Sequence, residues 1–343
     1  MSTPILIWGA GAIGGTLGAA FLRAGHRVTF VDSVAAHVDA INAGGLRIAG
    51  PIFADVVQAP ALLPQQVTGK HPLIFLCVKA LHTDAALAAL APHLAGDGVV
   101  VSAQNGLNEL AIARVVGNGR TIGCFVNFGA DYLEPGVVHY SGHGAAVIGE
   151  LDGAVTPRIQ TLHHLLQDFD PKAVLTQNIW GFLWGKLVYG ALLFATAVTN
   201  DSIADVLANP DARAVLTRLG QETGAVAAAE GIRTEAFDGF DPAAFRPDAT
   251  QAAIDTSFND MVAHNRRSAK SHSGIWRDLA IRKRQTEVVA QLGPIIAVAA
   301  RHGVPTPLTA QLITLIQDIE AGRRELTLAN LAVLASAAKG SCP

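Results

Sequence analysis

The chain has 343 residues, half of them hydrophobic, which is enough for two domains with separate cores. Its formal net charge is −3 and no basic block occurs, so the composition argues against a nucleic-acid partner. The longest apolar runs fall short of a membrane span of about 20 residues, and no basic region precedes an apolar stretch at the N-terminus. We therefore expect a cytoplasmic protein without membrane association.

Three cysteines are spread widely along the chain, and an odd number at such spacing predicts no framework of structural disulfides. Cys77 and Cys124 lie inside apolar, strand-like runs, where cysteine behaves as a small core residue. The third, Cys342, lies next to the C-terminal residue.

Strand and helix patterns alternate through the first half of the chain. An apolar run at 4–8 predicts a buried strand, and a glycine-rich turn, a helix at 16–24 and a strand at 27–31 follow it. The later segments predict strands and helices in turn: strands at 73–78, 98–102 and 121–126, helices at 83–94 and 109–115, and two β segments within 136–149. This alternation predicts an α/β Rossmann domain with a doubly wound, mostly parallel sheet.

Helical patterns replace this alternation after residue 155. The predicted helices span 158–167, 180–196, 211–230, 250–265, 275–302 and 309–320. The stretch 234–248, with two prolines and three phenylalanines, predicts an irregular insertion or a short lid. We expect a dinucleotide-binding domain at 1–172 and a helical substrate and dimerisation domain at 173–343.

The glycine-rich turn Gly9-Ala10-Gly11-Ala12-Ile13-Gly14 directly follows the first predicted strand and opens the first helix. In this context Gly9 permits a tight turn, Gly11 lets the backbone approach a pyrophosphate, and Gly14 allows close helix–strand packing. The helix N-terminus, with the backbone of Ala12 and Ile13, offers N–H groups and a positive dipole end to the phosphates. The alternative is a glycine-rich turn in a flavodoxin-like domain that binds no dinucleotide.

Asp32 ends the second predicted strand, at the position where a carboxylate binds the adenosine ribose hydroxyls and repels a 2′-phosphate. No arginine occupies 33–36, the positions where one would accept that phosphate. The pattern favours NAD(H) and leaves NADP(H) possible; the alternative is a solvent-facing aspartate at a turn.

Lys79 and Asn105 lie just past the carboxyl ends of two later strands, the edge at which open α/β sheets bind ligands. Either could instead be an ordinary surface or turn residue, because Asn-Gly is a common turn sequence.

Together with the second half of the chain, these residues resemble the ketopantoate reductase family (2-dehydropantoate 2-reductases) over the full length. Residues 183–187 (Leu-Trp-Gly-Lys-Leu) are similar to the family's Trp-x-Lys-Leu signature. Residues 273–278 (Ser-Gly-Ile-Trp-Arg-Asp) and 284–288 (Arg-Gln-Thr-Glu-Val) resemble its Ser-x-x-x-Asp and Thr-Glu-Ile segments. The resemblance implies a helical domain of the 6-phosphogluconate-dehydrogenase-like type, a homodimer, and an NAD(P)-dependent oxidoreductase acting on the CH–OH group of a 2-hydroxy acid.

The resemblance also implies roles for individual residues. Lys186 would be the general acid, and Glu287 would organise the substrate and that lysine. Asn105 would lie between nicotinamide and substrate, Ser273 near the substrate carboxylate and Lys79 near the cofactor. Ketone reduction needs a hydride and a proton, and a partly buried lysine has the lowered pKa that suits a proton donor.

Structural alternatives remain open for both of the implied catalytic residues in the helical domain. Lys186 could extend its stem to the surface. Glu287 could be an exposed helical glutamate that pairs with Lys283 or Arg284.

The chain departs from the family pattern one and two helical turns after Lys186. Gly190 and Phe194 stand where the family usually has asparagines. Without an amide to bond a substrate hydroxyl, preference for that hydroxyl is lost. We therefore expect a 2-oxo acid with an apolar or bulkier substituent.

Three further departures concern the substrate and cofactor sites. The spacings from Ser273 to Asp278 and from Asp278 to Glu287 are each one residue longer than in the family. Asp32 stands where the family often has a basic residue. His272 is an extra candidate for binding the substrate carboxylate or moving a proton, the alternative being a polar residue at a helix entry.

The leading hypothesis is thus NAD(H)-linked reduction of a 2-oxo acid, or the reverse oxidation. One alternative is 2-dehydropantoate 2-reductase activity with NADPH in pantothenate synthesis, and another is a catalytically silent NAD-sensing or scaffold protein. We expect no metal site, because the histidines at 139 and 143 and at 163 and 164 lack the spacing and partners of zinc ligands.

Overall fold

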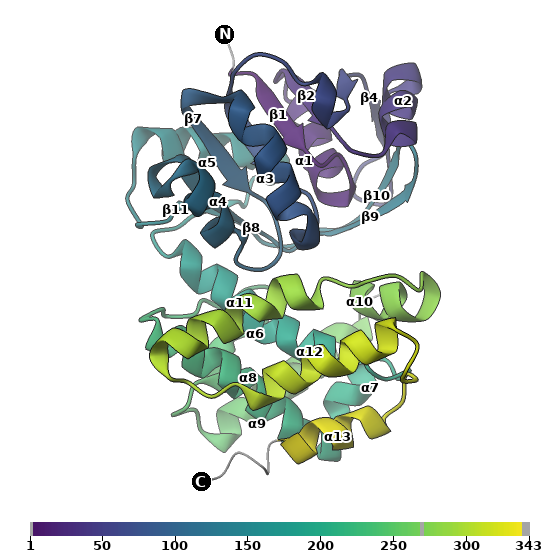
Figure 1. The fold of residues 1–343 in the computed structure, drawn as a ribbon, viewed down its shortest axis with the longest axis vertical. Coiled ribbons are helices and arrows are strands. Elements are labelled where there is room, and N and C mark those ends of the chain that lie inside the picture. The colour runs from purple at the N-terminus through teal and green to yellow at the C-terminus, as the bar shows by residue number, and fades with distance from the viewer. Residues whose placement is uncertain (1–2, 268–270, 338–343) are drawn as a thin grey trace. The chain divides into compact units, whose positions relative to one another are not determined.

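The computed structural model describes residues 3–267 and 271–337 and divides into two compact units, Met1–Ile179 and Trp180–Pro343, here called the Rossmann unit and the helical unit (Figure 1). The division falls at residue 179 rather than at the expected 172. The cause is a short edge strand, β12 (Val174–Leu175), which pairs with β11 and so belongs to the first unit. Cys342 lies outside the described residues.

The Rossmann unit is built on an eight-stranded sheet of order β12-β11-β8-β7-β6-β1-β2-β5. All neighbouring strands are parallel except β8 and β11, which confirms the expected mostly parallel sheet. The chain runs outward from β1 in both directions, which is the doubly wound arrangement. The strands are β1 (Ile5–Trp8), β2 (Val28–Val31), β5 (Ala61–Leu62), β6 (His71–Leu76), β7 (Leu94–Ser102), β8 (Thr121–Val126), β11 (Ala146–Glu150) and β12.

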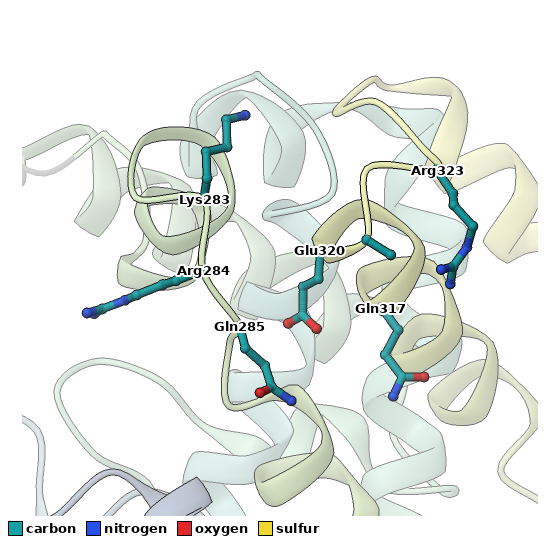
Figure 2. Close-up of a pocket in the computed structure, with 7 residues that line it drawn as sticks. Lys283, Arg284, Gln285, Gln317, Glu320 and Arg323 are labelled. Atoms are coloured by element: carbon teal, nitrogen blue, oxygen red, sulfur yellow. The ribbon is translucent and has the colours of Figure 1, made fainter.

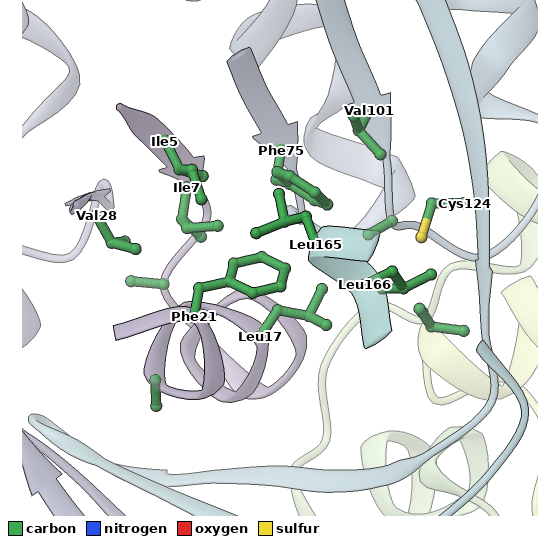
Figure 3. Packing of buried hydrophobic residues seen from close by; sticks show 14 of the residues in the cluster. Ile5, Ile7, Leu17, Phe21, Val28, Phe75, Val101, Cys124, Leu165 and Leu166 are labelled. Atoms are coloured by element: carbon green, nitrogen blue, oxygen red, sulfur yellow. The ribbon is translucent and has the colours of Figure 1, made fainter. Parts of the chain in front are cut away.

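Helices cover both faces of this sheet because successive side chains of each strand point to opposite faces. Ile5 and Ile7 of β1 belong to the core that α1 and α5 cover, and Figure 3 shows Leu17 and Phe21 of α1 within this cluster. Leu6 belongs to the core under α3 and α4. The helices are α1 (Ala12–Arg23), α2 (Ala35–Gly44), α3 (Thr83–Leu90), α4 (Asn108–Val116) and α5 (Pro157–Phe169).

A second, four-stranded sheet of order β4-β3-β10-β9 packs against α1. Only β10 was expected from the sequence, together with β11. The other strands are short or largely exposed, so they carry little of the apolar pattern that marks a buried strand. The strands are β3 (Leu46–Ala49), β4 (Asp55–Val57), β9 (Gly129–Glu134) and β10 (Val137–Gly142).

The helical unit consists of helices and irregular connections in the part of it that the structure describes. Its helices are α6 (Ile179–Thr196), α7 (Ile203–Ala208), α8 (Pro210–Ala229), α9 (Gln251–Arg267), α10 (Gly274–Trp276), α11 (Val288–His302), α12 (Pro307–Glu320) and α13 (Ala329–Ala337). An all-helical second domain is therefore confirmed, although α7 and α13 were not expected.

The prediction of one continuous helix over 275–302 is wrong. A π-helical turn, Arg277–Ile281, follows α10, and the helix then stops until α11 begins at Val288. The break is at Lys283, whose φ of +48° is a left-handed backbone conformation that no helix tolerates.

Two carboxylates hold this break in place. Asp278 is buried and accepts hydrogen bonds from both Arg282 and Arg284, so it draws the chain after the π-helical turn back onto itself. Glu320 at the end of α12 accepts the backbone N–H and the hydroxyl of Thr286 at 2.7 and 2.6 Å. The contact between Glu320 and Thr286 joins residues 34 positions apart in the sequence, which helical periodicity cannot reveal.

The stretch 234–248 is irregular, as expected, but its phenylalanines make it part of the core of the helical unit. Phe237, Phe240 and Phe245 are buried, and the ring of Phe240 lies 5.0 Å from that of Tyr189 on α6. These contacts do not fit the alternative of a lid.

Among the described residues, one helix, α6, is long and apolar enough to cross a membrane. Its most apolar window is 67% buried inside the structure, as in the core helix of a folded domain. Cys124 is also fully buried and Cys77 half-buried, in accord with the expected core roles.

Candidate active site

Four of the expected site positions lie along one edge of the main sheet. β2, β1, β6 and β7 are neighbours and parallel, so their carboxyl ends meet at the same edge. Asp32, Gly9, Lys79 and Asn105 follow these strands in that order across the sheet. The sheet therefore brings together side chains that are far apart in the sequence.

The glycine-rich loop after β1 makes contacts that exclude side chains at two of its positions. Gly9 has a φ of +101°, and a Cβ there would lie 2.8 Å from the backbone nitrogen of Val78. A Cβ at Gly14 would overlap the carbonyl oxygen of Gly9 and lie 2.7 Å from the side chain of Ile7. Helix α1 can therefore approach β1 closely only with glycine at these positions.

Gly11 differs, because a Cβ there would meet no atom within 4 Å. Gly11 is the N-cap residue of α1, it provides no side-chain cap, and the first turn has no acidic residue. The first backbone N–H groups of α1 therefore have no capping side chain and adjoin open space. This arrangement fits an anionic group such as a pyrophosphate.

Asp32 is hydrogen-bonded to the same loop. Its Oδ2 accepts the backbone N–H of Ala10 at 2.9 Å and its Oδ1 accepts that of Val34 at 3.0 Å. A carboxylate has further lone pairs, so hydroxyl donors can still bind it. Tyr132 of β9 shares this region, since burial first, and then the charges of Asp32 and Glu134, raise the pKa of its phenol.

A chain of buried hydrogen bonds fixes the loops that carry Lys79 and Asn105. The Gln104 amide donates to the carbonyl of Val78 and to the hydroxyl of Thr83, both at 2.8 Å. Thr83 donates to Asn108, whose amide donates to the carbonyl of Asn105 at 2.7 Å. Asn105 itself is exposed, so its side chain is held at the sheet edge without being covered.

Glu109, in the first turn of α4, is a fully buried carboxyl. Among the described residues, neither of its oxygens has a hydrogen-bond partner of good geometry. Burial raises its pKa from 4.5 to about 7, while its own backbone N–H and the Ser102 hydroxyl lower it less. The sequence pattern of α4 does not single out this residue.

In the helical unit, α6 carries Lys186, Gly190 and Phe194 at intervals of four, so all three lie on one side of the helix. Lys186 is half-buried, and a Cβ at Gly190 would meet no atom within 4 Å. Phe194, in contrast, is only 1% exposed. Open space therefore adjoins α6 one turn after the lysine.

The other expected residues of this unit lie at the ends of helices. Glu287 is half-buried at the N-cap of α11, and Ser273 caps α10 by accepting the N–H of Trp276. His272 contacts the carbonyl of Asn200 at 3.2 Å and the hydroxyl of Ser271 at 2.9 Å, and its ring packs on Trp276. Both ring nitrogens of His272 are thus engaged within the protein, which favours the structural alternative for this residue.

A pocket of about 490 Å³ lies beside the interruption of the helix before α11. Figure 2 shows the residues that line it. Lys283, Arg284 and Arg323 give it positive charge, but Arg284 pairs with Asp278, and Arg323 pairs with Asp318. A neighbouring pocket shares Lys283 and Arg284. None of the expected site residues lines either pocket, so neither is the expected substrate site.

Sequence reasoning did not find three residues of the Rossmann unit that bond or adjoin the expected site: His37, Gln104 and Tyr132. They lie in segments without a recognisable motif, and their contacts depend on the three-dimensional arrangement. Within 3–267 and 271–337 no group of three or more His, Cys, Asp or Glu side chains could hold a metal ion.

Residues 5–153 match the family model described as Ketopantoate reductase PanE/ApbA, and residues 178–320 match its C-terminal counterpart. The chain belongs to the ketopantoate reductase family. A 2-dehydropantoate 2-reductase of Archaeoglobus fulgidus is 28% identical over 320 residues, covering 93% of this chain and 98% of the relative. Another, of Pyrococcus horikoshii, is 32% identical over 191 residues, covering 55% of this chain and 61% of the relative. The chain is therefore an oxidoreductase that acts on CH–OH groups and uses a nicotinamide cofactor.

Solved structures share the fold over nearly the whole chain. A ketopantoate reductase of Ralstonia eutropha is 25% identical with a TM-score of 0.79, covering 94% of this chain and 99% of that one. A ternary structure of D-mandelate dehydrogenase with NADH and anilino(oxo)acetate is 22% identical with a TM-score of 0.80. It covers 93% of this chain and 99% of that one. The expected fold class is thereby confirmed for both domains.

Glu109→Gln is expected to make the folded chain more stable at pH 8. Because the folded pKa of about 7 exceeds the ordinary value of 4.5, the native carboxyl contributes its full stability below pH 4.5. That contribution is lost as the pH rises towards 7, up to about 3 kcal/mol. Glutamine cannot ionise, so urea unfolding from pH 5 to 8 should show a weaker loss of stability in the variant. The exposed control Glu134→Gln should follow the native profile, and identical profiles for all three proteins would contradict a buried neutral carboxyl.

Proposed function

We propose that this enzyme converts a 2-oxo acid into the 2-hydroxy acid, or catalyses the reverse reaction, with NAD(H) as the preferred cofactor and Lys186 as the proton donor. The proposed cofactor residues belong to the Rossmann unit, and the proposed proton donor belongs to the helical unit. Membership of the ketopantoate reductase family supports the reaction class.

One observation carries the proposal of a proton donor: Lys186 is the sole charged side chain of α6, an 18-residue helix whose other residues are mostly apolar. It is half-buried, and Gly190 leaves open space one turn further along. A lysine in such surroundings suits protonation of an alkoxide that develops near it.

The nicotinamide supplies or accepts the hydride when bound. In the direction of reduction, Lys186 donates its proton to the carbonyl oxygen, so the products are the 2-hydroxy acid and the oxidised cofactor. We assign Glu287 to orient Lys186 and the substrate, Asn105 to the nicotinamide and the substrate carbonyl, and Ser273 to the substrate carboxylate. Lys79 and the backbone at Gly9, Gly11, Ala12, Ile13 and Gly14 are assigned to the cofactor.

The substrate proposal rests on Gly190 more than on Phe194. Glycine offers no amide for a substrate hydroxyl and leaves room for a larger substituent. The ring of Phe194 is almost fully buried, so it defines the packing of α6 more than the wall of a site. D-mandelate dehydrogenase, which shares this fold, is solved with anilino(oxo)acetate, an acid that carries an aryl group.

The second candidate is 2-dehydropantoate 2-reductase activity with NADPH; the names of the relatives favour the activity. Asp32 argues against NADPH, because its carboxylate would repel a 2′-phosphate. The expected homodimer and cytoplasmic location stay predictions.

Cofactor titrations are expected to give a lower KM for NADH than for NADPH. Asp32→Ala should narrow this gap, since it removes both the repulsion and a ribose hydrogen bond. Asp39→Ala, which removes an exposed carboxylate of the same unit, should leave the gap unchanged. A native enzyme at least about tenfold more efficient with NADPH would overturn this reading of Asp32.

Lys186→Ala should lower turnover by roughly 10²-fold or more, the usual contribution of a general acid. NADH binding should stay near the native value, as measured by fluorescence titration. Lys172→Ala, an exposed lysine of the Rossmann unit, is the control and should keep full turnover. Near-normal turnover of Lys186→Ala would remove this residue from the chemistry.

Substrate choice is best tested by kcat/KM for ketopantoate, for 2-oxoisovalerate, which lacks the hydroxyl, and for an aryl 2-oxo acid. We expect no preference for ketopantoate in the native enzyme. Gly190→Asn should shift preference towards it, while Gly190→Leu, of similar size but without the amide, should not. A native preference for ketopantoate of about 10³ or more would restore the alternative function.

A further inference from the structure

A buried histidine outside the expected site, His37, connects the glycine-rich loop to the second sheet. It lies in α2 and is fully buried. Its Nε2 lies 2.9 Å from the carbonyl oxygen of Ala10, and its Nδ1 lies 2.8 Å from the backbone nitrogen of Gly136. Ala10 belongs to the loop, and Gly136 lies in the turn between β9 and β10.

These two hydrogen bonds determine the protonation state of the imidazole. A backbone N–H can only donate, so the Nδ1 that faces Gly136 must carry a lone pair. A backbone carbonyl can only accept, so the Nε2 that faces Ala10 must carry the proton. His37 is therefore neutral, with its proton on Nε2, and a charged imidazolium would set two N–H groups against each other at Gly136.

Side chains thus bond both backbone polar groups of Ala10, its N–H and its carbonyl. Asp32 accepts its N–H at 2.9 Å, and His37 donates to its carbonyl. Rotating the backbone at this position would break one or both bonds, and a buried group that loses its partner is costly. Ala10 directly precedes Gly11, the N-cap of α1, so its orientation sets the direction of the helix N–H groups.

The second sheet surrounds His37 on its other side. The ring of Tyr132 on β9 meets it edge-on, with centroids 5.1 Å apart at 74°. A Cβ at Gly136 would lie 3.0 Å from Ala40 of α2, so the turn also packs closely on this helix. The position of the turn is therefore coupled to the position of the loop through one side chain.

We propose that His37 is a positioning residue for the dinucleotide: through the Ala10 carbonyl it holds the glycine-rich loop in the conformation that presents the N-terminus of α1 to the pyrophosphate. Gly136 of the second sheet fixes the orientation of the imidazole. The proposal deepens the proposed function and rests on it, because it requires that the loop binds a nicotinamide dinucleotide.

Two substitutions separate the two hydrogen bonds. The amide oxygen of asparagine takes the place of Nδ1, so His37→Asn keeps the bond from Gly136 and loses the donor to Ala10. The amide nitrogen of glutamine takes the place of Nε2, so His37→Gln keeps that donor. We expect the Kd for NADH to rise roughly tenfold in His37→Asn and less than about threefold in His37→Gln. The measurement is NADH fluorescence titration of the purified full-length chain.

A matched control removes another imidazole that meets a backbone carbonyl in the same unit. His163 lies 2.8 Å from the carbonyl of Ala173, outside the loop, and His163→Gln should leave the Kd unchanged. At saturating NADH, His37→Asn should keep a near-native kcat, which separates positioning of the cofactor from general loss of structure. Two-bond ¹H–¹⁵N spectra of the native chain should show the proton of His37 on Nε2, a readout that stands even where the variants do not fold.

Native-like NADH binding by folded His37→Asn, or a proton on Nδ1 in the native chain, would overturn the role of His37 alone. A native chain that binds neither NADH nor NADPH would instead overturn the proposed function, and the role of His37 with it.

Discussion

Helix α1 can begin close against β1 only because position 14 has no side chain. A single Cβ there would overlap the carbonyl of Gly9, and the helix would have to move away from the sheet. This close approach places the uncapped N-terminus of α1 at the carboxyl edge of the central strands, next to Asp32. The proposed cofactor site in the Rossmann unit depends on that contact, because the contact fixes where the glycine-rich loop and the positive end of the helix dipole lie.

The two units differ in physical character. The Rossmann unit offers backbone N–H groups and a fixed carboxylate at a sheet edge, which suits a charged, extended cofactor. The helical unit offers one lysine in an apolar helix, with space beside it at Gly190.

Local sequence patterns predicted five parallel strands of the main sheet, β1, β2, β6, β7 and β8, and most helices, because these elements carry the apolar periodicity of their own burial. They did not predict the two-residue edge strands β5 and β12. The glycine motif predicted the close approach of α1 to β1 because its contacts are also mostly local. Gly9 and Gly14 meet atoms within one βαβ unit and at the end of the neighbouring strand. The break before α11 escaped prediction because it depends on a positive φ at Lys283 and on Glu320 of α12, 34 residues after Thr286. His37 escaped because its partners lie 27 and 99 residues away in the sequence.

The second sheet also has a consequence for folding. β3 pairs with β10 in parallel, joining Arg47 to Val137 across 90 residues of chain. Ordering so long a loop costs entropy before any strand pairing compensates for it, so this sheet contributes non-local, slowly formed contacts. During synthesis the glycine-rich loop and His37 emerge before the β9–β10 turn. His37 can therefore accept the N–H of Gly136 only after that turn has been added. His37 thus completes its hydrogen bonds only after the 99 residues that separate it from Gly136 have been made.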